Sequence, residues 1–192
     1  TEVDLTKWQL IDAGGGFGNS ELQYYRPDNA YVENGLLVIE TQIQKSTDAP
    51  LSPADESFSS AKLTTQDLFE FKHGRVDIRV AAAEGQGFWS AAWMLGANVD
   101  DIGWPFAGEI DIFDTVGGVL GGVPQEGRIL HNAYWNSDGP FAPGQYTNPR
   151  NYQRSSYSPT PGGGQLAWGE RVINEANEGE TFSNTFHLIS TE

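Results

Sequence analysis

The 192-residue chain contains no cysteine. This absence excludes disulfide frameworks, zinc–thiolate sites and cysteine nucleophiles, and it leaves the redox compartment undetermined. The sequence also lacks any run of eighteen or more apolar residues, which excludes a membrane-spanning helix and predicts no membrane partner. It shows no internal repeat and no linker, so we expect a single domain over residues 1–192.

Basic residues are few, because 11 Lys and Arg stand against 26 Asp and Glu and give a formal net charge of −15. Such a surface repels nucleic acids, whose binding depends on Lys and Arg that neutralise phosphates. It also repels sulfated or uronic polysaccharides unless a local basic patch overrides the overall field. The composition therefore predicts no nucleic-acid partner and favours a neutral one, although solubility alone would also explain the acidity.

Sustained helical periodicity is missing, and short strand patterns take its place. The patterns predict strands at residues 36–43, 76–80, 88–95, 108–113 and 129–135. The second alternates apolar and charged residues, and the third is an apolar run typical of a buried central strand. Residues 137–164 are rich in Pro, Gly, Ser and Asn and predict a long loop. Together these features predict an all-β fold, an antiparallel β-sandwich or jelly roll.

The segment Glu109–Ile110–Asp111–Ile112–Phe113–Asp114 carries three carboxylates. On a regular strand Glu109 and Asp111 share a face, whereas Asp114 would point to the other side. A β-bulge at Ile112–Phe113 returns Asp114 to the shared face. Like charges this close raise at least one pKa, as a general acid near neutral pH requires. A half-exposed edge strand has the same alternation, so the spacing alone leaves catalysis and simple exposure both open.

Aromatic residues are frequent near this cluster in the sequence: Trp89, Trp93, Trp104 and Trp135, with Tyr24 and Tyr25 further away. Indole rings stack on the flat C–H faces of sugars, so a Trp-lined cleft beside paired carboxylates is typical of a glycosidase. For each tryptophan taken alone, a structural role in the hydrophobic core remains an equally good explanation. We expect Trp93, which lies within the apolar run, to be mainly structural.

Six motifs occur in order along the chain: residues 18–25 (GNSELQYY), 32–40 (VENGLLVIE), 60–65 (SAKLTT), 73–79 (HGRVDIR), 85–96 (GQGFWSAAWMLG) and 103–112 (GWPFAGEIDI). Together they resemble glycoside hydrolase family sixteen, and within it the laminarinase-like endo-β-1,3-glucanases. The resemblance implies a jelly roll of two curved antiparallel sheets with a concave substrate cleft. It also implies a secreted enzyme that cleaves a neutral β-glucan polysaccharide by a retaining double displacement.

The resemblance further implies roles for single residues. Glu109 lies where the family has its nucleophile, Asp111 where it has the assisting aspartate, and Asp114 where it has the acid/base. Substrate-binding positions are expected at Asn19, Glu21, Arg75, Trp89, Trp104, His131 and Trp135. No cofactor or catalytic metal is required, and the resemblance leaves room for a structural calcium ion, as in many relatives.

Two departures from the family pattern keep alternatives open. The family's acid/base is normally glutamate, and Asp114 is shorter by one methylene, about 1.5 Å in reach. A non-catalytic β-glucan-binding module therefore remains an alternative, as does an agarase-like galactanase of the same fold. The chain also ends at Phe186–Glu192, where the family begins another strand. We therefore expect a domain truncated at its carboxy terminus, whose missing strands come from a longer chain, a second polypeptide or a swapped copy.

Overall fold

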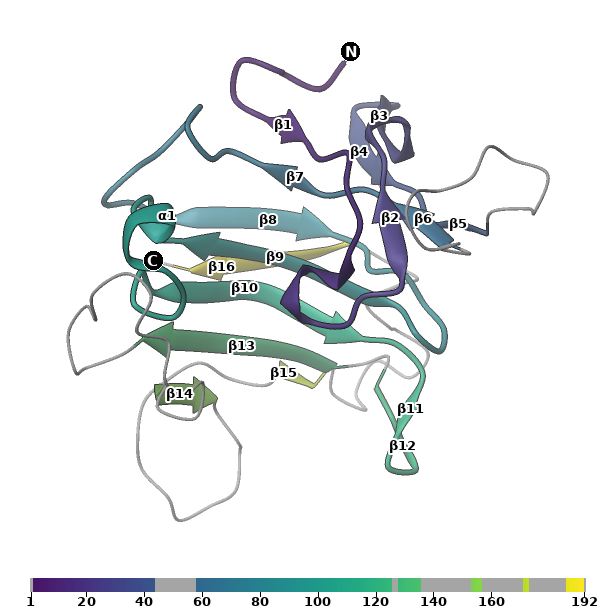
Figure 1. The fold of residues 1–192 in the computed structure, drawn as a ribbon. Helices are drawn as coiled ribbons and strands as arrows, with labels where there is room; N and C mark the ends of the chain where they lie inside the picture. Colours follow the sequence, from purple (N-terminus) through teal and green to yellow (C-terminus); the bar gives the residue numbers. More distant parts are fainter. Residues whose placement is uncertain are drawn as a thin grey trace. The chain divides into compact units, whose positions relative to one another are not determined.

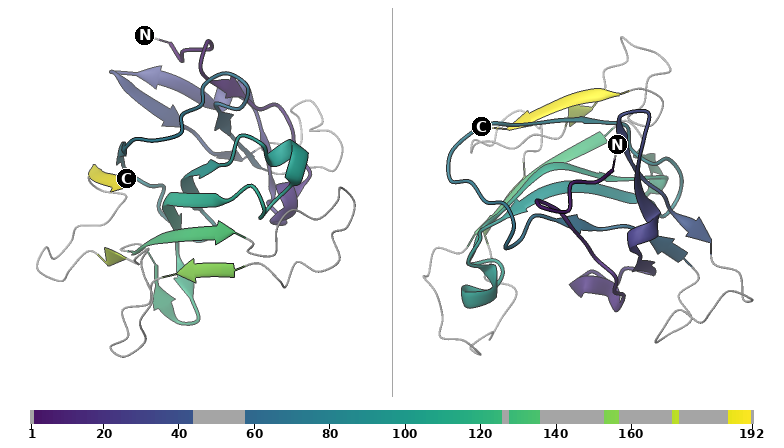
Figure 2. Two further views of the ribbon diagram at one scale, coloured as in Figure 1. Left: turned by 90° about the vertical axis from the view of Figure 1, so that its left-hand side faces the viewer. Right: turned by 90° about the horizontal axis from the view of Figure 1, so that it is seen from above.

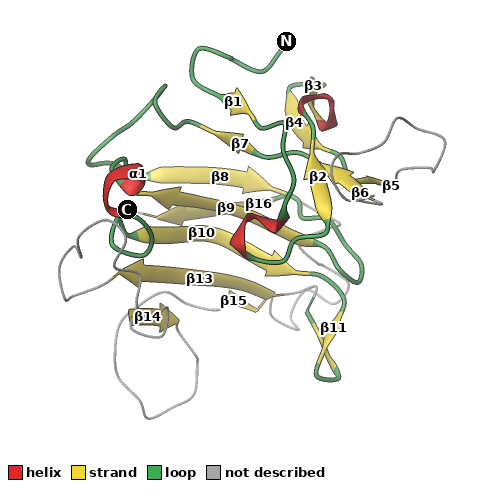
Figure 3. Ribbon diagram, viewed as in Figure 1, coloured by secondary structure: helices red, strands yellow, loops and turns green. Residues whose placement is uncertain are grey.

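The computed structural model describes residues 2–43, 58–125, 128–135, 153–156, 171–172 and 186–191, and strands dominate among them (Figure 3). The chain divides into two compact units, Thr1–Lys72 and His73–Glu192 (Figure 1). Among the described residues, no helix is long and apolar enough to cross a membrane.

The first unit is built from short strands and two 3-10 turns, Gly16–Gly18 and Pro27–Asn29. Its strands are β1 (Gln9–Leu10), β2 (Gln23–Tyr25), β3 (Ala30–Glu33), β4 (Leu36–Ile39), β5 (Gln42–Ile43), β6 (Phe58–Ser60) and β7 (Leu63–Thr64). Strand β6 pairs in parallel with β2 and antiparallel with β5. Two further antiparallel pairs, β1 with β7 and β3 with β4, complete the described part of this unit.

The β3–β4 hairpin turns at Asn34–Gly35, where both residues have positive φ, 50° and 79°. Positive φ at both central positions is the requirement of a type I′ turn, which Asn-Gly meets well. The strand predicted over residues 36–43 is interrupted after Ile39. At the interruption, the Glu40 N–H donates to the Asn29 carbonyl and Asn29 Nδ2 donates to the Glu40 carbonyl, each at 2.8 Å.

The second unit contains two layers of strands. Its larger sheet has the order β14-β13-β10-β9, made of β14 (Gln153–Ser156), β13 (Arg128–Trp135), β10 (Glu109–Val116) and β9 (Trp89–Leu95), and β15 (Arg171–Val172) also pairs with β13. The second layer is the antiparallel pair of β8 (Val76–Val80) and β16 (His187–Thr191). Figure 2 shows β16 in a layer apart from β10 and β13. A one-turn helix, α1 (Val99–Ile102), and a hairpin of β11 (Val119–Leu120) and β12 (Val123–Pro124) complete the elements.

The core of the second unit lies between these two layers. Ile112 and Phe113 from β10 and Ile129 from β13 contribute from the larger sheet, and Ile189 of β16 packs against them. The partly buried side chains that complete the core are Val76, Ile78, Val80, Ala92 and Met94. The alternation predicted for residues 76–80 is therefore confirmed, with the apolar residues of β8 facing inward.

Two predictions about segments need correction. Residues 88–95 do not form a buried central strand: β9 ends the sheet order of the described strands, and its side chains alternate between the core and an open face. The apolar run misleads because two of its large residues are tryptophans that remain exposed. The loop predicted over residues 137–164 contains β14, which pairs with β13, and its other residues lie outside the described part.

Ile129→Ala should destabilise the protein by about 2–5 kcal/mol, because the fully buried side chain (0% exposed) would leave a cavity between the layers. Urea unfolding measures the free-energy change. The matched control is Ile43→Ala, at a position that is 76% exposed, where we expect a change within about 0.5 kcal/mol. Equal effects of the two variants would contradict this description of the core.

Candidate active site

A β-bulge in β10 organises the candidate site. Between Asp111 and Asp114, β10 advances three residues while its partner β13 advances two, from Asn132 to Leu130. The pairing with β9 shows a shift within the same segment, between Asp111 and Phe113. One extra residue in a strand reverses the side-chain parity beyond it. The bulge predicted at Ile112–Phe113 is therefore confirmed.

The bulge brings the carboxylates to one face of the sheet. Asn132 Nδ2 donates to Asp111 Oδ2 at 2.8 Å and to Asp114 Oδ2 at 3.4 Å, so these two side chains point the same way. Glu109, two residues before Asp111 on a regular stretch of strand, shares their face. Ile112 and Phe113 enter the core on the opposite face. The shared face that the odd spacing requires is thus present.

Two tryptophans donate to the carboxylates through their indole N–H groups. Trp104 Nε1 donates to Glu109 Oε2 at 2.7 Å, and Trp89 Nε1 donates to Asp114 Oδ1. The Trp104 ring packs at a tilt against Tyr134, with ring centroids 5.7 Å apart. An indole can only donate, so both contacts favour the ionised carboxylate. The expected nearness of Trp89 and Trp104 to the cluster is confirmed, whereas their contact with substrate stays a prediction.

Burial raises the pKa of Glu109 to about 7. The negative charge of Asp111 and a hydrogen bond between the two side chains raise it further, the Trp104 N–H lowers it, and the charge of Asp114 adds a small increase. The expectation that crowded carboxylates raise at least one pKa is therefore confirmed, and the group affected is Glu109. The cluster consequently holds a proton close to neutral pH.

The structure corrects the interpretation of Trp93 as mainly structural. Trp93 lies opposite Asp111 in the β9–β10 pairing, and opposite residues of an antiparallel pair share a face. Its side chain is 41% exposed, and that of Trp89 on the same face is 56% exposed. Both rings therefore border the carboxylates. The continuous apolar run hid this because Ala92 and Met94, not its tryptophans, face the core.

The register of β13 argues against His131 as a substrate contact. Asn132 lies opposite Asp111, and alternation places His131 on the other face of the strand, which it shares with the buried Ile129. Asn132 is instead the side chain that meets the carboxylates, and the sequence interpretation did not select it. Only the register of the two strands could have distinguished these neighbours.

Arg75 does not lie with the carboxylates either. Its Nε donates to Asp77 Oδ1 at 2.8 Å, and both side chains are exposed. Asp77 points away from the core, because its neighbours Val76 and Ile78 pack into it. The carboxylates face outward from the opposite layer, so the core separates them from Arg75.

Asn19 and Glu21 belong to the first unit, where they form a hydrogen-bonded group with two residues that were not predicted to bind substrate. Asn19 Nδ2 donates to Glu21 Oε1 at 3.0 Å, while Gln23 Nε2 and the Tyr25 hydroxyl donate to Oε2 at 3.0 and 2.5 Å. Burial, followed by the hydrogen bond to Glu21 and its charge, raises the pKa of Tyr25. The i, i+2, i+4 spacing of Glu21, Gln23 and Tyr25 is the signal that could have revealed this group.

Two further aromatic residues singled out in the sequence are Tyr24 and Trp135. Tyr24 packs under the guanidinium of Arg26, 5.2 Å from its ring centroid. Trp135 is the last residue of β13, and its side chain lies outside the described part. The predicted substrate contact of Trp135 stays a prediction.

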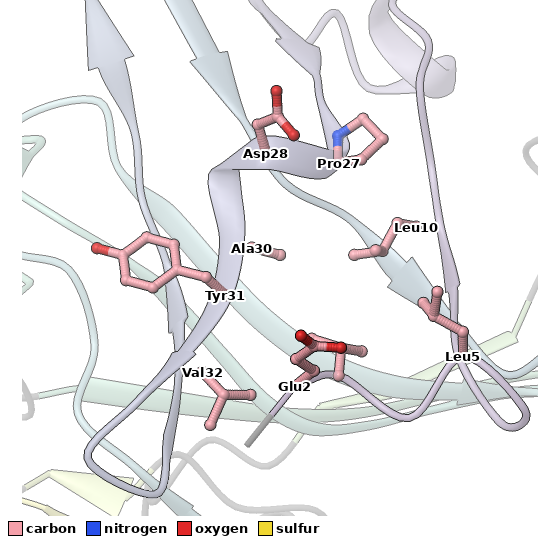
Figure 4. A pocket seen from close by; sticks show the side chains of 9 residues that line it. Glu2, Leu5, Leu10, Pro27, Asp28, Ala30, Tyr31 and Val32 are labelled. Carbon is pink, nitrogen blue, oxygen red and sulfur yellow. The ribbon is translucent and has the colours of Figure 1, made fainter.

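A pocket of about 410 Å³ lies in the first unit and contains none of the predicted site residues (Figure 4). It is mainly apolar, with carboxyl groups from Glu2 and Asp28 among its lining side chains. Within the described ranges no group of three or more His, Cys, Asp or Glu could hold a metal ion.

The sequence profile described as Glycosyl hydrolases family 16 matches residues 23–157. Among curated proteins, the glucan endo-1,3-beta-glucosidase A1 of Niallia circulans is 34% identical over 149 residues, covering 70% of this chain and 21% of that protein. The beta-1,3-glucan-binding protein of Penaeus monodon is 39% identical over 89 residues, covering 44% of this chain and 22% of that protein. The chain thus spans about a fifth of the length of these two relatives.

The solved catalytic domain of an endo-1,3-beta-glucanase (laminarinase) from Thermotoga petrophila RKU-1 aligns with a TM-score of 0.71 and 30% identity. The alignment covers 99% of this chain and 65% of that one. Together with the two strand layers of the second unit, this likeness confirms the predicted all-β jelly-roll class.

Glu109 should make the stability of the protein fall as pH rises from about 4.5 to about 7. In that window the folded state keeps a proton that the unfolded state has lost, because the pKa rises from 4.5 to about 7 on folding. Glu109→Gln removes this contribution, so the variant should gain stability relative to the wild type across the window. Urea unfolding at several pH values measures the difference, with the exposed Glu70→Gln as control. A constant difference between Glu109→Gln and wild type would contradict the perturbed titration.

Proposed function

Because the chain belongs to glycosyl hydrolase family 16, we propose that it is a retaining endo-β-1,3-glucanase whose chemistry is carried out by Glu109, Asp111 and Asp114. The observation that carries the proposal is the bulge, which places the three carboxylates on one face beside Trp89 and Trp104. Hydrolysis of a glycosidic bond with retention needs a nucleophilic carboxylate and a carboxylic acid on the same side of a cleft.

In the proposed reaction, ionised Glu109 attacks the anomeric carbon while Asp114 protonates the departing glycosidic oxygen. The resulting covalent glycosyl–enzyme is hydrolysed by a water that Asp114, now ionised, deprotonates. Asp111 shares a hydrogen bond with Glu109 and modulates its charge. Since the pKa of Glu109 is raised to about 7, the nucleophile becomes fully available only above neutral pH. These steps need no cofactor.

A neutral glucan suits both the site and the whole chain. The net charge of −15 disfavours anionic polymers. The exposed rings of Trp89 and Trp93 provide surfaces on which sugar C–H faces can stack. The relative from Niallia circulans is named for 1,3-linked glucan, which supports that linkage here. A polymeric substrate of this kind also favours secretion of the protein.

A second candidate function is glucan binding without hydrolysis. It is favoured by the surroundings of Asp114, which accepts hydrogen bonds from Trp89 and Asn132. Both donors favour the ionised carboxylate, whereas a general acid must begin protonated. A relative named as a beta-1,3-glucan-binding protein supports this alternative.

The absence of Arg75 from the carboxylate face removes one reason to consider a galactan as the substrate.

Glu109→Gln should lower turnover of laminarin by on the order of 1000-fold or more while leaving oligosaccharide affinity nearly unchanged, because ring stacking does not need the nucleophile's charge. Reducing-end assays measure turnover, and isothermal titration calorimetry measures binding. Glu70→Gln, which removes an exposed glutamate, is the matched control and should retain wild-type turnover. Comparable hydrolysis by Glu109→Gln and wild type would rule out the assigned nucleophile.

Substitutions of Asp114 separate the two candidate functions. If Asp114 is the acid, Asp114→Asn should lose about 100-fold or more on laminarin. An activated aryl glycoside, whose leaving group needs little protonation, should lose much less in the first step. If the wild type binds laminarin without hydrolysing it and Asp114→Glu hydrolyses it, the binding function is correct.

A further inference from the structure

Asn132 joins two of the three carboxylates. Its side chain is fully buried (0% exposed), and its Nδ2 donates to Asp111 Oδ2 at 2.8 Å and to Asp114 Oδ2 at 3.4 Å. A primary amide carries two N–H hydrogens, so one nitrogen can serve both carboxylates. The geometry arises because β13 remains regular where β10 bulges, which sets Asp111 and Asp114 on either side of the same amide.

The amide has a definite electrostatic effect. Its nitrogen donates at every pH and never accepts, and a donor stabilises the ionised form of a carboxylate. The Trp89 N–H acts on Asp114 in the same direction, through the other oxygen, Oδ1. Glu109 differs, because burial and its neighbours raise its pKa to about 7. Asn132 therefore contributes to a difference in acid strength between carboxylates on one strand.

Among the described side chains of β9, β10 and β13, few other charged groups neighbour Asp114. On β10 the titratable neighbours are Glu109 and Asp111. The sequence of β9, WSAAWML, contributes no acidic or basic side chain. On β13, His131 lies on the opposite face, and Arg128 is the first residue of the strand. Asn132 is thus well placed to influence how Asp114 ionises.

We propose that Asn132 is a positioning residue that holds the Asp114 carboxylate beside Asp111 and favours its ionised form. The inference deepens the proposed hydrolase function and rests on it for its catalytic consequence. With Asn132 present, Asp114 is a stronger acid and loses its proton at lower pH. Without it, the carboxylate is less ordered and keeps its proton to higher pH.

The direct test is a carbon-13 NMR titration of the side-chain carboxyl groups in the wild type and in Asn132→Ala, with the Asp114 signal assigned by its loss in Asp114→Asn. We expect the Asp114 midpoint to rise by about one pH unit in Asn132→Ala. The matched control is Asn29→Ala, which removes another buried amide, one that donates to the Glu40 backbone carbonyl. It should lower the melting temperature without moving the midpoint.

Kinetics supply a second readout. In Asn132→Ala the limb of the kcat/KM pH profile on laminarin that follows Asp114 should move upward by about one unit. This is the acidic limb, since Glu109 titrates near pH 7. The kcat should fall about tenfold while KM changes little. A purely structural role would lower stability and leave the limb in place. An unchanged Asp114 midpoint, or an equal shift in Asn29→Ala, would overturn the inference.

If Asn132→Ala does not fold, Asn132→Asp keeps the shape and replaces the donor with an acceptor. It should raise the Asp114 midpoint further, and a wild-type midpoint in this variant would overturn the inference. The titration does not depend on turnover, so the proposed hydrolase function and the proposed role of Asn132 can be refuted independently. If the Asp114 midpoint shifts as expected but the wild type hydrolyses no glucan, only the proposed function is overturned. If the wild type hydrolyses glucan but the Asp114 midpoint is unchanged in the Asn132 variants, only this inference is overturned.

Discussion

The candidate site depends on one extra residue in β10. Alternation along a regular strand would place Asp114 on the core face, opposite Glu109 and Asp111. The bulge at Ile112–Phe113 lets two consecutive large apolar side chains enter the core and returns Asp114 to the carboxylate face. Packing energy in the core and the geometry of the site are therefore linked, because the residues that anchor the bulge are also among the most buried in the second unit.

Three carboxylates on one face repel one another, and hydrogen bonds from side-chain donors partly offset this repulsion. Trp104 donates to Glu109, Trp89 to Asp114, and Asn132 to both Asp111 and Asp114. None of these donors can accept a hydrogen bond through the same nitrogen, so each favours an ionised partner. Their effect is unequal, since burial and the nearby Asp111 still raise the pKa of Glu109. A site that differentiates its carboxylates in this way is suited to acid–base chemistry.

The differences between the sequence interpretation and the structure share a cause. The apolar segment around Trp93 predicts a core position, but its side chain alternates onto the open face. The family resemblance implies a substrate-binding role for His131, yet the register brings its neighbour Asn132 to the carboxylates. Arg75 lies in a matching motif, but it directly precedes β8, which belongs to the other layer. In each case the residue type was informative and the direction of the side chain was not.

The sequence by itself determined the fold class, the four long strands β8, β9, β10 and β13 and the identity of the three carboxylates. It did so because strand periodicity, Asn-Gly turns and ordered motifs are local properties of the chain. It also required the bulge, since the odd spacing of Glu109 and Asp114 could not otherwise produce a shared face. Only the tertiary structure decided which partners meet these groups. Trp89, Trp93 and Asn132 reach them through the pairing of β10 with β9 and β13, and register is set by long-range packing rather than by local pattern.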